Sequence, residues 1–306
     1  MKARLIADGG EAASGEVDFF RSPAFLDAEG VTHSIEIDGE DALRLPVIVR
    51  PIDADERIDA ISPYGYPGAS GQPQKPLETS EIDWSETGLV SVFVRGRIGD
   101  EAPLTGGTVR NHVHVADGDT GIRKRLREQI RRNERRGWAV QAIPGPEADD
   151  GARAAFERAY GETMARTGAA ERYLYPSEYF ERLLQSDRSW LMVAAREGAG
   201  LAGAIAVASD GYLHYYLGGT ADEALGDSPM KNLFAGMISL GTELSLPVNL
   251  GGGLSPGDSL DSFKRGFATG EAPFRTHELI CDPGAYEELA ARTGPAPEGF
   301  FPAYRA

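Results

Sequence analysis

The sequence predicts an α+β protein of two halves, each a mostly antiparallel sheet flanked by helices. Three observations lead to this prediction. Alternating apolar residues in residues 34–50 and 190–217 predict antiparallel strands joined by short turns. Apolar residues at helical spacing in residues 152–166 and 230–244 predict amphipathic helices among those strands. A length of 306 residues is enough for two domains of ordinary size.

The composition is typical of a globular protein, with 41% hydrophobic and 25% charged residues. No apolar run is long enough to span a bilayer, and the N-terminus lacks the apolar segment of a secretory signal. We therefore expect a cytoplasmic protein with no membrane span. The single cysteine, Cys281, excludes an internal disulfide, and the five histidines lack a metal-binding spacing, so we expect no metal site.

The N-terminal part is predicted to consist largely of strands. Residues 34–50, SIEIDGEDALRLPVIVR, have the pattern of a hairpin around a polar turn. Further strands are predicted at residues 88–97 and 108–115. Residues 61–71, ISPYGYPGASG, predict a stiff loop that displays Tyr64 and Tyr66. These tyrosines are candidates for lining a ligand groove, although packing within the turn is at least as common for such residues.

Residues 121–137 are strongly basic in a chain whose net charge is −16. They contain eight arginine or lysine residues and two glutamates. Ile122, Leu126 and Ile130 form a narrow apolar seam, which predicts a helix whose surface is mostly charged and exposed. The negative net charge argues against a general nucleic-acid binder. This one-signed stripe could still bind a polyanion, and a merely solvated face is an equally weighted alternative.

A segment rich in proline, glycine and acidic residues, PGPEADDG, follows the next predicted strand and is the expected domain boundary. The predicted domains are residues 1–146, which include the basic helix, and residues 147–284. The C-terminal tail, residues 285–306, is expected to pack on the first domain. The second domain has the order helix, helix, three antiparallel strands, helix, strand, helix and strand. Its antiparallel strands are predicted at residues 190–195, 201–208 and 212–217.

Residues 247–267, PVNLGGGLSPGDSLDSFKRGF, combine a short strand, three glycines and a compact helix. Asp258 is a candidate N-cap of this helix. The predicted buried stripe consists of Leu260, Phe263 and Phe267. Lys264 lies beside that stripe, close to glycines whose backbone a ligand can approach. A cation there could stabilise a developing oxyanion; the alternative is an ordinary turn with a lysine that reaches water.

The order of elements in the second half resembles the acetyltransferase-like fold called GNAT. In that fold a splayed sheet opens a V-shaped cleft between the fourth and fifth strands. The resemblance implies that the strand ending at Leu217 is the fourth and that residues 248–250 form the fifth, with Lys264 near the mouth of the cleft. CoA-dependent members hold the pyrophosphate on an Arg/Gln-x-x-Gly-x-Gly/Ala loop. Residues 219–232 lack that pattern and contain three carboxylates, which disfavours CoA.

Two motifs resemble the FemABX-like aminoacyltransferases, which are tRNA-dependent enzymes built from two GNAT-like halves. RKRLREQIRRNERRGWAV is similar to their basic helix, and FKRGF, residues 263–267, is similar to their Phe-Lys catalytic motif. The resemblance would cover nearly the whole chain. Two features depart from it: residues 63–68, PYGYPG, replace the Arg-Gly-Pro element of cell-wall members, and a long helical hairpin insert is missing. The first departure puts a cell-wall acceptor in doubt.

The resemblance implies transfer of an aminoacyl group from aminoacyl-tRNA to a primary amine of a small molecule, a peptide or a cell-wall precursor, with no bound cofactor. Lys264 would stabilise the oxyanion and Phe263 would pack its helix. His214 and Tyr216 are candidate bases, although a structural role is more frequent for a strand histidine. The implied tRNA-binding residues are Arg127, Arg131, Arg132, Arg135 and Arg136. The implied substrate-binding residues are Tyr64, Tyr66, Asn232, Gly251, Gly252 and Gly253.

Two other functions remain compatible with these residues. The same fold could transfer an acetyl or other acyl group from an acyl-CoA to an amine. The chain could also be a non-catalytic binding protein that retains a GNAT-like cleft. Dependence on RNA separates the first alternative from aminoacyl transfer, and the effect of removing Lys264 separates the second.

Overall fold

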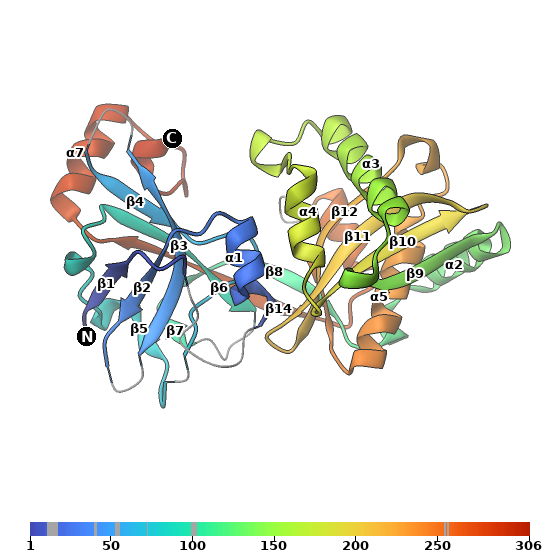
Figure 1. Cartoon of the computed structure of the whole chain (residues 1–306), viewed down its shortest axis with the longest axis horizontal. Helices are drawn as coiled ribbons and strands as arrows, with labels where there is room; N and C mark the ends of the chain where they lie inside the picture. The colour runs from blue at the N-terminus through green and yellow to red at the C-terminus, as the bar shows by residue number, and fades with distance from the viewer. Residues whose placement is uncertain are drawn as a thin grey trace. The chain divides into compact units, whose positions relative to one another are not determined.

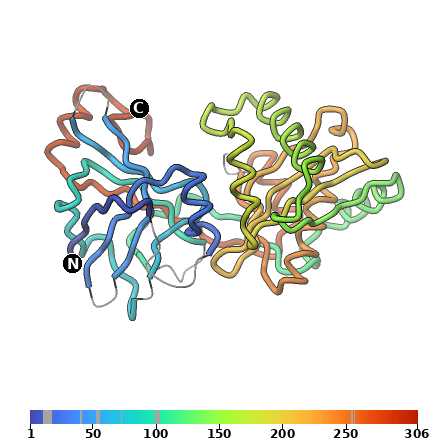
Figure 2. Tube along the Cα trace, viewed as in Figure 1, coloured from blue at the N-terminus to red at the C-terminus, as the bar shows by residue number. Residues whose placement is uncertain are grey.

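The computed structural model describes residues 1–10, 18–39, 42–52, 56–71, 73–98, 103–253, 255 and 257–306. The chain forms two compact units, whose elements are labelled in Figure 1 and whose trace is followed in Figure 2. Unit 1 comprises residues 1–111 and 273–306, and unit 2 comprises residues 112–272. Among the described residues, no helix has the length and apolar character that crossing a membrane requires.

Unit 2 is built on strands in the order β9-β10-β11-β12-β13-β8. They are β8 (Thr108–Ala116), β9 (Trp138–Pro144), β10 (Ser189–Arg196), β11 (Ala199–Ser209), β12 (Tyr212–Thr220) and β13 (Val248–Gly251). The strands β10, β11 and β12 are antiparallel, which confirms the predicted meander, and β9 is antiparallel to β10. β13 is parallel to β12 and antiparallel to β8. The short turns of the meander allow only antiparallel neighbours, whereas the longer connection between β12 and β13 permits a parallel pair.

Helices cover both faces of this sheet. They are α2 (Lys124–Arg135), α3 (Asp150–Thr167), α4 (Ser177–Leu184), α5 (Met230–Leu244) and α6 (Ser259–Arg265). Ala202 and Ala204 of β11 belong to the core that includes α5, whereas Gly203 between them faces Phe156 of α3. Because successive residues of a strand point to opposite faces, α3 and α5 lie on opposite sides of the sheet.

Helix α3 packs so closely on β12 that a glycine is required there. A Cβ atom at Gly219 would lie 2.4 Å from the carbonyl oxygen of Ala159, which is backbone and cannot rotate away. We expect Gly219→Ala to lower the free energy of unfolding by about 1–3 kcal/mol because of this overpacking. Gly226→Ala is the matched control, since no atom lies within 4 Å of a Cβ at that position. Denaturant unfolding of both variants tests this; equal stability would contradict the close packing.

Unit 1 has strands in the order β1-β2-β3-β4-β6-β14. They are β1 (Ala3–Ile6), β2 (His33–Ile37), β3 (Leu43–Pro51), β4 (Ile58–Ile61), β6 (Ser91–Ile98) and β14 (Gly270–Ile280). β4 and β6 form the parallel pair, as β12 and β13 do in unit 2. Short strands β5 (Leu77–Glu78) and β7 (Leu104–Thr105) pair separately, and the helices are α1 (Pro23–Ala28) and α7 (Pro283–Thr293). The predicted N-terminal hairpin is β2 and β3, and residues 40 and 41 of its turn lie outside the described residues.

The connection between the parallel strands differs between the two units. No α-helix lies between β4 and β6 among the described residues, whereas α5 connects β12 to β13. Past the end of β4, Ser62 continues the pairing with β6, and the side chain of Arg95 donates a hydrogen bond to the Ser62 carbonyl at 2.8 Å. Among the described residues, a parallel strand pair joined through an α-helix is therefore found in unit 2 only.

The units divide the chain differently from the predicted domains. Residue 146, the predicted boundary, lies inside unit 2, and residues 273–284 belong to unit 1. β9 pairs with β10 along its whole length and α2 contacts α5, so the basic helix belongs to unit 2. PGPEADDG has the composition of a linker but forms the turn from β9 into α3. Residues 285–306 belong to unit 1, where Leu289 and Tyr304 are buried.

Candidate active site

The candidate site lies where β12 and β13 part. These strands pair only at Leu213 with Val248 and at His214 with Asn249. β12 then continues to Thr220, with a register irregularity opposite Ile205 and Ala206, while β13 ends at Gly251. A parallel pair this short, followed by divergence, is the splay that was predicted between the fourth and fifth strands. The end of β13, where the glycines follow, therefore has β8 but not β12 paired beside it.

Lys264 is held at this end of β13. The α6 helix begins after Asp258, whose Oδ1 accepts a hydrogen bond from the Asp261 N–H at 2.7 Å, so the predicted N-cap is confirmed. Lys264 is 6% exposed, and its Nζ donates a hydrogen bond to the Gly252 carbonyl at 2.8 Å. Gly251 has a φ of 75°, and a Cβ there would lie 3.0 Å from Nζ. Glycine is therefore required at position 251 by both its conformation and the approach of Lys264.

Phe263 anchors α6 on the core of unit 2. Its ring lies 5.3 Å from that of Phe234 in α5 and 5.4 Å from that of Phe267, between ring centroids. The prediction that Leu260 shares this stripe is wrong, because Leu260 is 40% exposed. The helix is only one and a half to two turns long and ends at Arg265, so just its last turn reaches the core.

Tyr215 is a site residue that sequence reasoning missed. Lys264 Nζ lies 5.3 Å from the centroid of its ring, a cation-π contact. Burial raises the pKa of Tyr215 to about 12, so the phenol remains neutral at physiological pH. Tyr216, the residue that was predicted, instead has its hydroxyl 2.8 Å from that of Tyr179. Strand alternation offered the missing signal, since Leu213 and Tyr215 share the face that packs on α5.

The surroundings of Lys264 have opposite effects on the pKa of its ammonium group. Burial lowers its pKa from 10.5 to about 8, while Asp258 and Asp261 act in the opposite direction. Within the described part of the chain, no carboxylate lies within ion-pair distance of its Nζ. An ammonium group has three N–H donors. With one donor on Gly252, two are left to bind an anionic oxygen.

Because the pKa of Lys264 is lowered, we expect a decrease of kcat at moderately alkaline pH. The protonated form stabilises an oxyanion, and it predominates below the pKa of about 8. We therefore expect kcat to fall as pH rises through about 8, rather than near the ordinary lysine value. Steady-state rates between pH 6 and 10 test this. A fall of kcat near pH 10 instead would contradict the role of a buried Lys264 with a lowered pKa in the rate-limiting step.

His214 stabilises the strands next to the site. Asn249 Nδ2 donates to its Nδ1 at 3.0 Å, and its Nε2 donates to the Ser209 carbonyl at 3.0 Å. Asn249 Oδ1 in turn accepts the Gly251 N–H at 2.8 Å. Both ring nitrogens are thus engaged, and this chain of hydrogen bonds orients the glycine turn. The base roles of His214 and Tyr216 stay predictions, although each side chain has a structural contact.

The remaining predicted substrate-binding residues have contacts other than Lys264. Asn232 Nδ2 donates to the Ile130 carbonyl at 3.2 Å, and its Oδ1 accepts from Asn133 at 2.8 Å, so its side chain joins α5 to α2. Tyr64 and Tyr66 belong to unit 1. Tyr66 packs edge-on against Phe20 and Phe274. Gly253 lies against Asp258, because a Cβ there would be 2.5 Å from its Oδ1.

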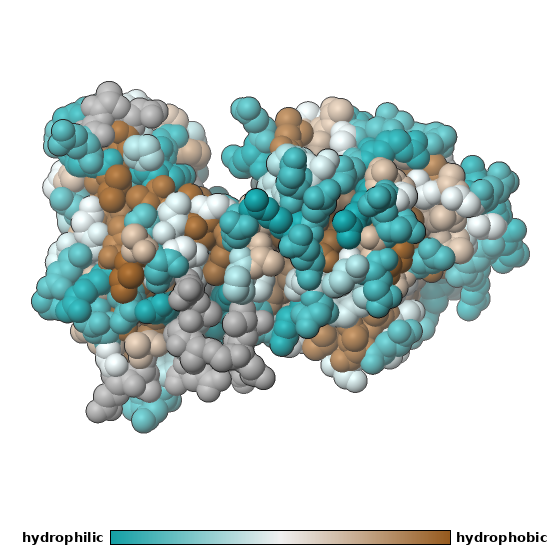
Figure 3. Space-filling model, in the orientation of Figure 1, coloured by the Kyte–Doolittle hydropathy of each residue, from teal (hydrophilic) through white to brown (hydrophobic). Residues whose placement is uncertain are grey.

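The predicted tRNA-binding side chains form an exposed basic face on α2. All five side chains are exposed: Arg127, Arg131, Arg132, Arg135 and Arg136. Hydrophilic residues gather at the right-hand edge of Figure 3, where α2 lies. Arg136 is paired with Asp227 at 2.8 Å. No ion pair with a described residue is found for the other four. Burial, followed by the charges of Arg132 and Arg125, lowers the pKa of Lys231 on α5, so the positive potential extends to that helix.

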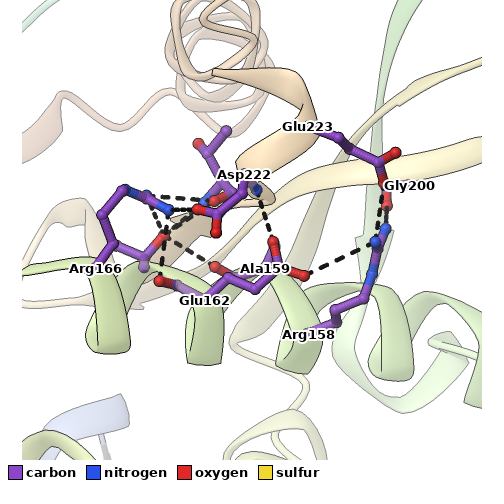
Figure 4. Close-up of polar contacts among 9 residues, drawn as sticks. Arg158, Ala159, Glu162, Arg166, Gly200, Asp222 and Glu223 are labelled. Atoms are coloured by element: carbon purple, nitrogen blue, oxygen red, sulfur yellow. Dashed lines mark hydrogen bonds and ion pairs between the residues drawn. The ribbon is translucent and has the colours of Figure 1, made fainter.

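The acidic loop between β12 and α5 is tied to its neighbours. Asp222 forms an ion pair with Arg166, and Glu223 pairs with Arg158 at 2.9 Å (Figure 4). The Asp222 N–H donates to Glu162 at 2.6 Å, so part of the loop backbone is also engaged with α3. Asp227 accepts from Trp138 at 3.1 Å besides its pairing with Arg136. The three carboxylates of this loop therefore have basic or N–H partners within unit 2.

Comparisons with known proteins agree with this fold. Residues 121–256 match the family model described as acetyltransferase (GNAT) domain, which spans unit 2 from α2 to the end of β13. The crystal structure of FemX superposes with a TM-score of 0.56 at 11% identity, over 83% of this chain and 89% of FemX. The chain has a GNAT-like fold, which is similar to that of FemX over most of its length.

Two further structures have a similar fold. The C-terminal domain of a putative lysylphosphatidylglycerol synthetase from Agrobacterium fabrum has a TM-score of 0.58 at 11% identity, over 91% of this chain and 92% of that domain. L-PGS from Bacillus licheniformis has a TM-score of 0.56 at 14% identity, over 85% and 88%. No curated protein matches the chain in sequence. Within the described residues, no group of three or more histidine, cysteine or acidic side chains could hold a metal ion.

Proposed function

We propose that this protein is an aminoacyltransferase that moves an aminoacyl group from aminoacyl-tRNA to a primary amine, forming an amide. The observation that carries the proposal is the buried ammonium of Lys264, which keeps two N–H donors available at the open end of β13. The amine nitrogen attacks the ester carbonyl, and negative charge develops on its oxygen. Lys264 stabilises that charge. The bond to the ribose oxygen then breaks, and the proton lost by the amine passes to that oxygen.

Two features support tRNA as the donor. The basic face of α2 offers arginines without carboxylate partners among the described residues, as phosphate binding requires. The loop between β12 and α5, which would hold a CoA pyrophosphate in other GNAT proteins, carries Asp222, Glu223 and Asp227 and is tied to its neighbours. Negative side chains at that place oppose a diphosphate.

The acceptor is proposed to be an amine of a small molecule or peptide in the cytoplasm, where charged tRNA is made. The lysylphosphatidylglycerol synthetase, whose C-terminal domain has a similar fold, is named for an aminoacylated lipid product. A cell-wall precursor is the third possible acceptor. An acyl-CoA donor is the second candidate function, favoured by the match to the GNAT acetyltransferase domain.

A parallel assay of donors tests the proposal. Purified protein is incubated with a panel of amines and either total tRNA charged with labelled amino acids or labelled acetyl-CoA, each with and without prior ribonuclease. We expect an amide product from charged tRNA that disappears after ribonuclease treatment. Product from acetyl-CoA after RNA is destroyed would establish the second candidate instead. Saturable binding of an amine without product from either donor would indicate a non-catalytic binding protein.

A further inference from the structure

The carboxylate of Asp261 lies one helical turn before Lys264 but is directed to other partners. Asp261 is 6% exposed, and its Oδ1 lies 2.7 Å from His114 Nε2. Its Oδ2 accepts a hydrogen bond from Arg265 at 2.7 Å. His114 stands opposite Gly251 in the ladder between β8 and β13, so this contact joins α6 to the strand beside the glycine turn. Both oxygens of Asp261 are therefore engaged away from Lys264.

Asp258 is held in a similar way by backbone groups. Its Oδ1 accepts from the Asp261 N–H and its Oδ2 accepts from the Ser255 N–H at 2.9 Å. The hydrogen bond from His114 lowers the pKa of Asp261, so that carboxylate stays charged at neutral pH. Asp258 caps the helix that carries Lys264, and Asp261 lies one helical turn before it, so two fixed negative charges lie near the ammonium without an ion pair. Both raise the pKa of Lys264 against the effect of burial, Asp258 more than Asp261.

The other polar groups around Lys264 do not supply this charge. Tyr215 of β12 contributes a neutral ring. His114 of β8 and Arg265 of α6 reach the site through Asp261. Glu271 lies 3.3 Å from the Nδ1 of His114, on the far side of that ring from Asp261. The two aspartates are thus the described acidic groups that oppose the effect of burial on Lys264.

We propose that Asp258 and Asp261 are positioning residues, which keep the Lys264 ammonium charged while leaving its N–H donors available to the reacting oxygen. A buried lysine with no nearby anion loses its proton readily. A direct ion pair would restore the charge but would occupy the donors and neutralise the field at the oxyanion. Carboxylates fixed by His114, Arg265 and backbone N–H groups avoid both problems. The inference deepens the proposed function and rests on the role given there to Lys264.

Direct titration of the lysine ammonium groups tests this inference without any substrate. The chain has only five lysines, Lys2, Lys75, Lys124, Lys231 and Lys264, so their signals can be followed by NMR with labelled lysine. Lys264→Met identifies the Lys264 signal by its loss. We expect Asp258→Asn and Asp261→Asn each to lower the pKa of Lys264 by about one unit. Asparagine is a good N-cap, so Asp258→Asn retains the start of α6.

Two internal references make the result specific. Asp149 caps α3 in the same unit, and Asp149→Asn should leave the Lys264 titration unchanged. Lys231, whose pKa is also lowered, responds to Arg132 and Arg125 and should not move in either variant. If the Lys264 pKa is unchanged in both Asp258→Asn and Asp261→Asn, the inference is overturned.

The same variants separate this inference from the proposed function. In the active enzyme, we expect the alkaline limb of kcat to move to lower pH by the shift that NMR records, with KM for the donor little changed. A purely structural role of the aspartates would lower kcat at every pH without moving the limb, which would overturn the inference. A shifted NMR titration in a protein that transfers no aminoacyl group would support the inference about charge while refuting the proposed function.

Discussion

Replacing Lys264 by methionine is expected to slow amide formation about 10²- to 10³-fold, the effect of losing one well-placed oxyanion donor. Methionine approximates the length and apolar stem of lysine, so it should fill the space next to Tyr215 and Gly252. The loss should appear in kcat, because the interaction with the oxygen becomes strong only when charge develops. Single-turnover rates with charged tRNA measure it directly.

Stability provides the control for this variant. Lys264 is buried at an energetic cost, since burial lowers its pKa, so removing the charge should leave thermal stability unchanged or raised. Lys75→Met changes an exposed lysine of unit 1 and should have no effect on kcat. Undiminished turnover of a well-folded Lys264→Met variant would show that Lys264 has no chemical role and would refute the proposed mechanism.

Replacing Arg131, Arg132 and Arg135 together by glutamine is expected to raise KM for charged tRNA and to weaken its dependence on salt. Each arginine that contacts a phosphate releases a counterion, so the slope of log affinity against log salt should fall by up to about three charges. Turnover at saturating tRNA should remain close to that of the wild type, because these residues lie on α2 and not at Lys264.

A matched variant controls for the change in net charge. Arg4, Arg110 and Arg292 are exposed arginines of unit 1, and replacing all three removes the same charge. Their surface ion pairs contribute little to stability, so the protein should remain folded. A salt slope that drops equally in both triple variants would mean that overall charge, and not the basic face of α2, governs tRNA binding.

Much of the fold of unit 2 could be predicted because its signals are local. Strand alternation and short turns predicted the meander from β10 to β12, and helical spacing predicted α5. The boundary between units could not be predicted in the same way. A proline- and glycine-rich segment has the same composition in a linker and in a turn, and only the pairing of β9 with β10 shows which one is present.

The candidate site was predictable in part for the same reason. Asp258, the glycines and Lys264 lie within fourteen residues, so their proximity follows from one turn and one short helix. His114 and Asp261 are 147 positions apart in the sequence, and no local sequence pattern predicts their contact. Tyr215 and Tyr216 are both tyrosines on one strand, and the choice between them depends on which face α5 and α6 cover.

Residue order alone indicates which groups this region carries: a cation on a capped helix, a glycine turn before it and a basic helix upstream. Tertiary structure decided how those groups behave. Burial makes Lys264 a lysine with a pKa of about 8 instead of an ordinary surface cation. Contacts with His114, Arg265 and the loop backbone direct the nearby carboxylates away from it. Desolvation and the geometry of long-range contacts exist only in the folded chain, which is why neither could be obtained from residue order.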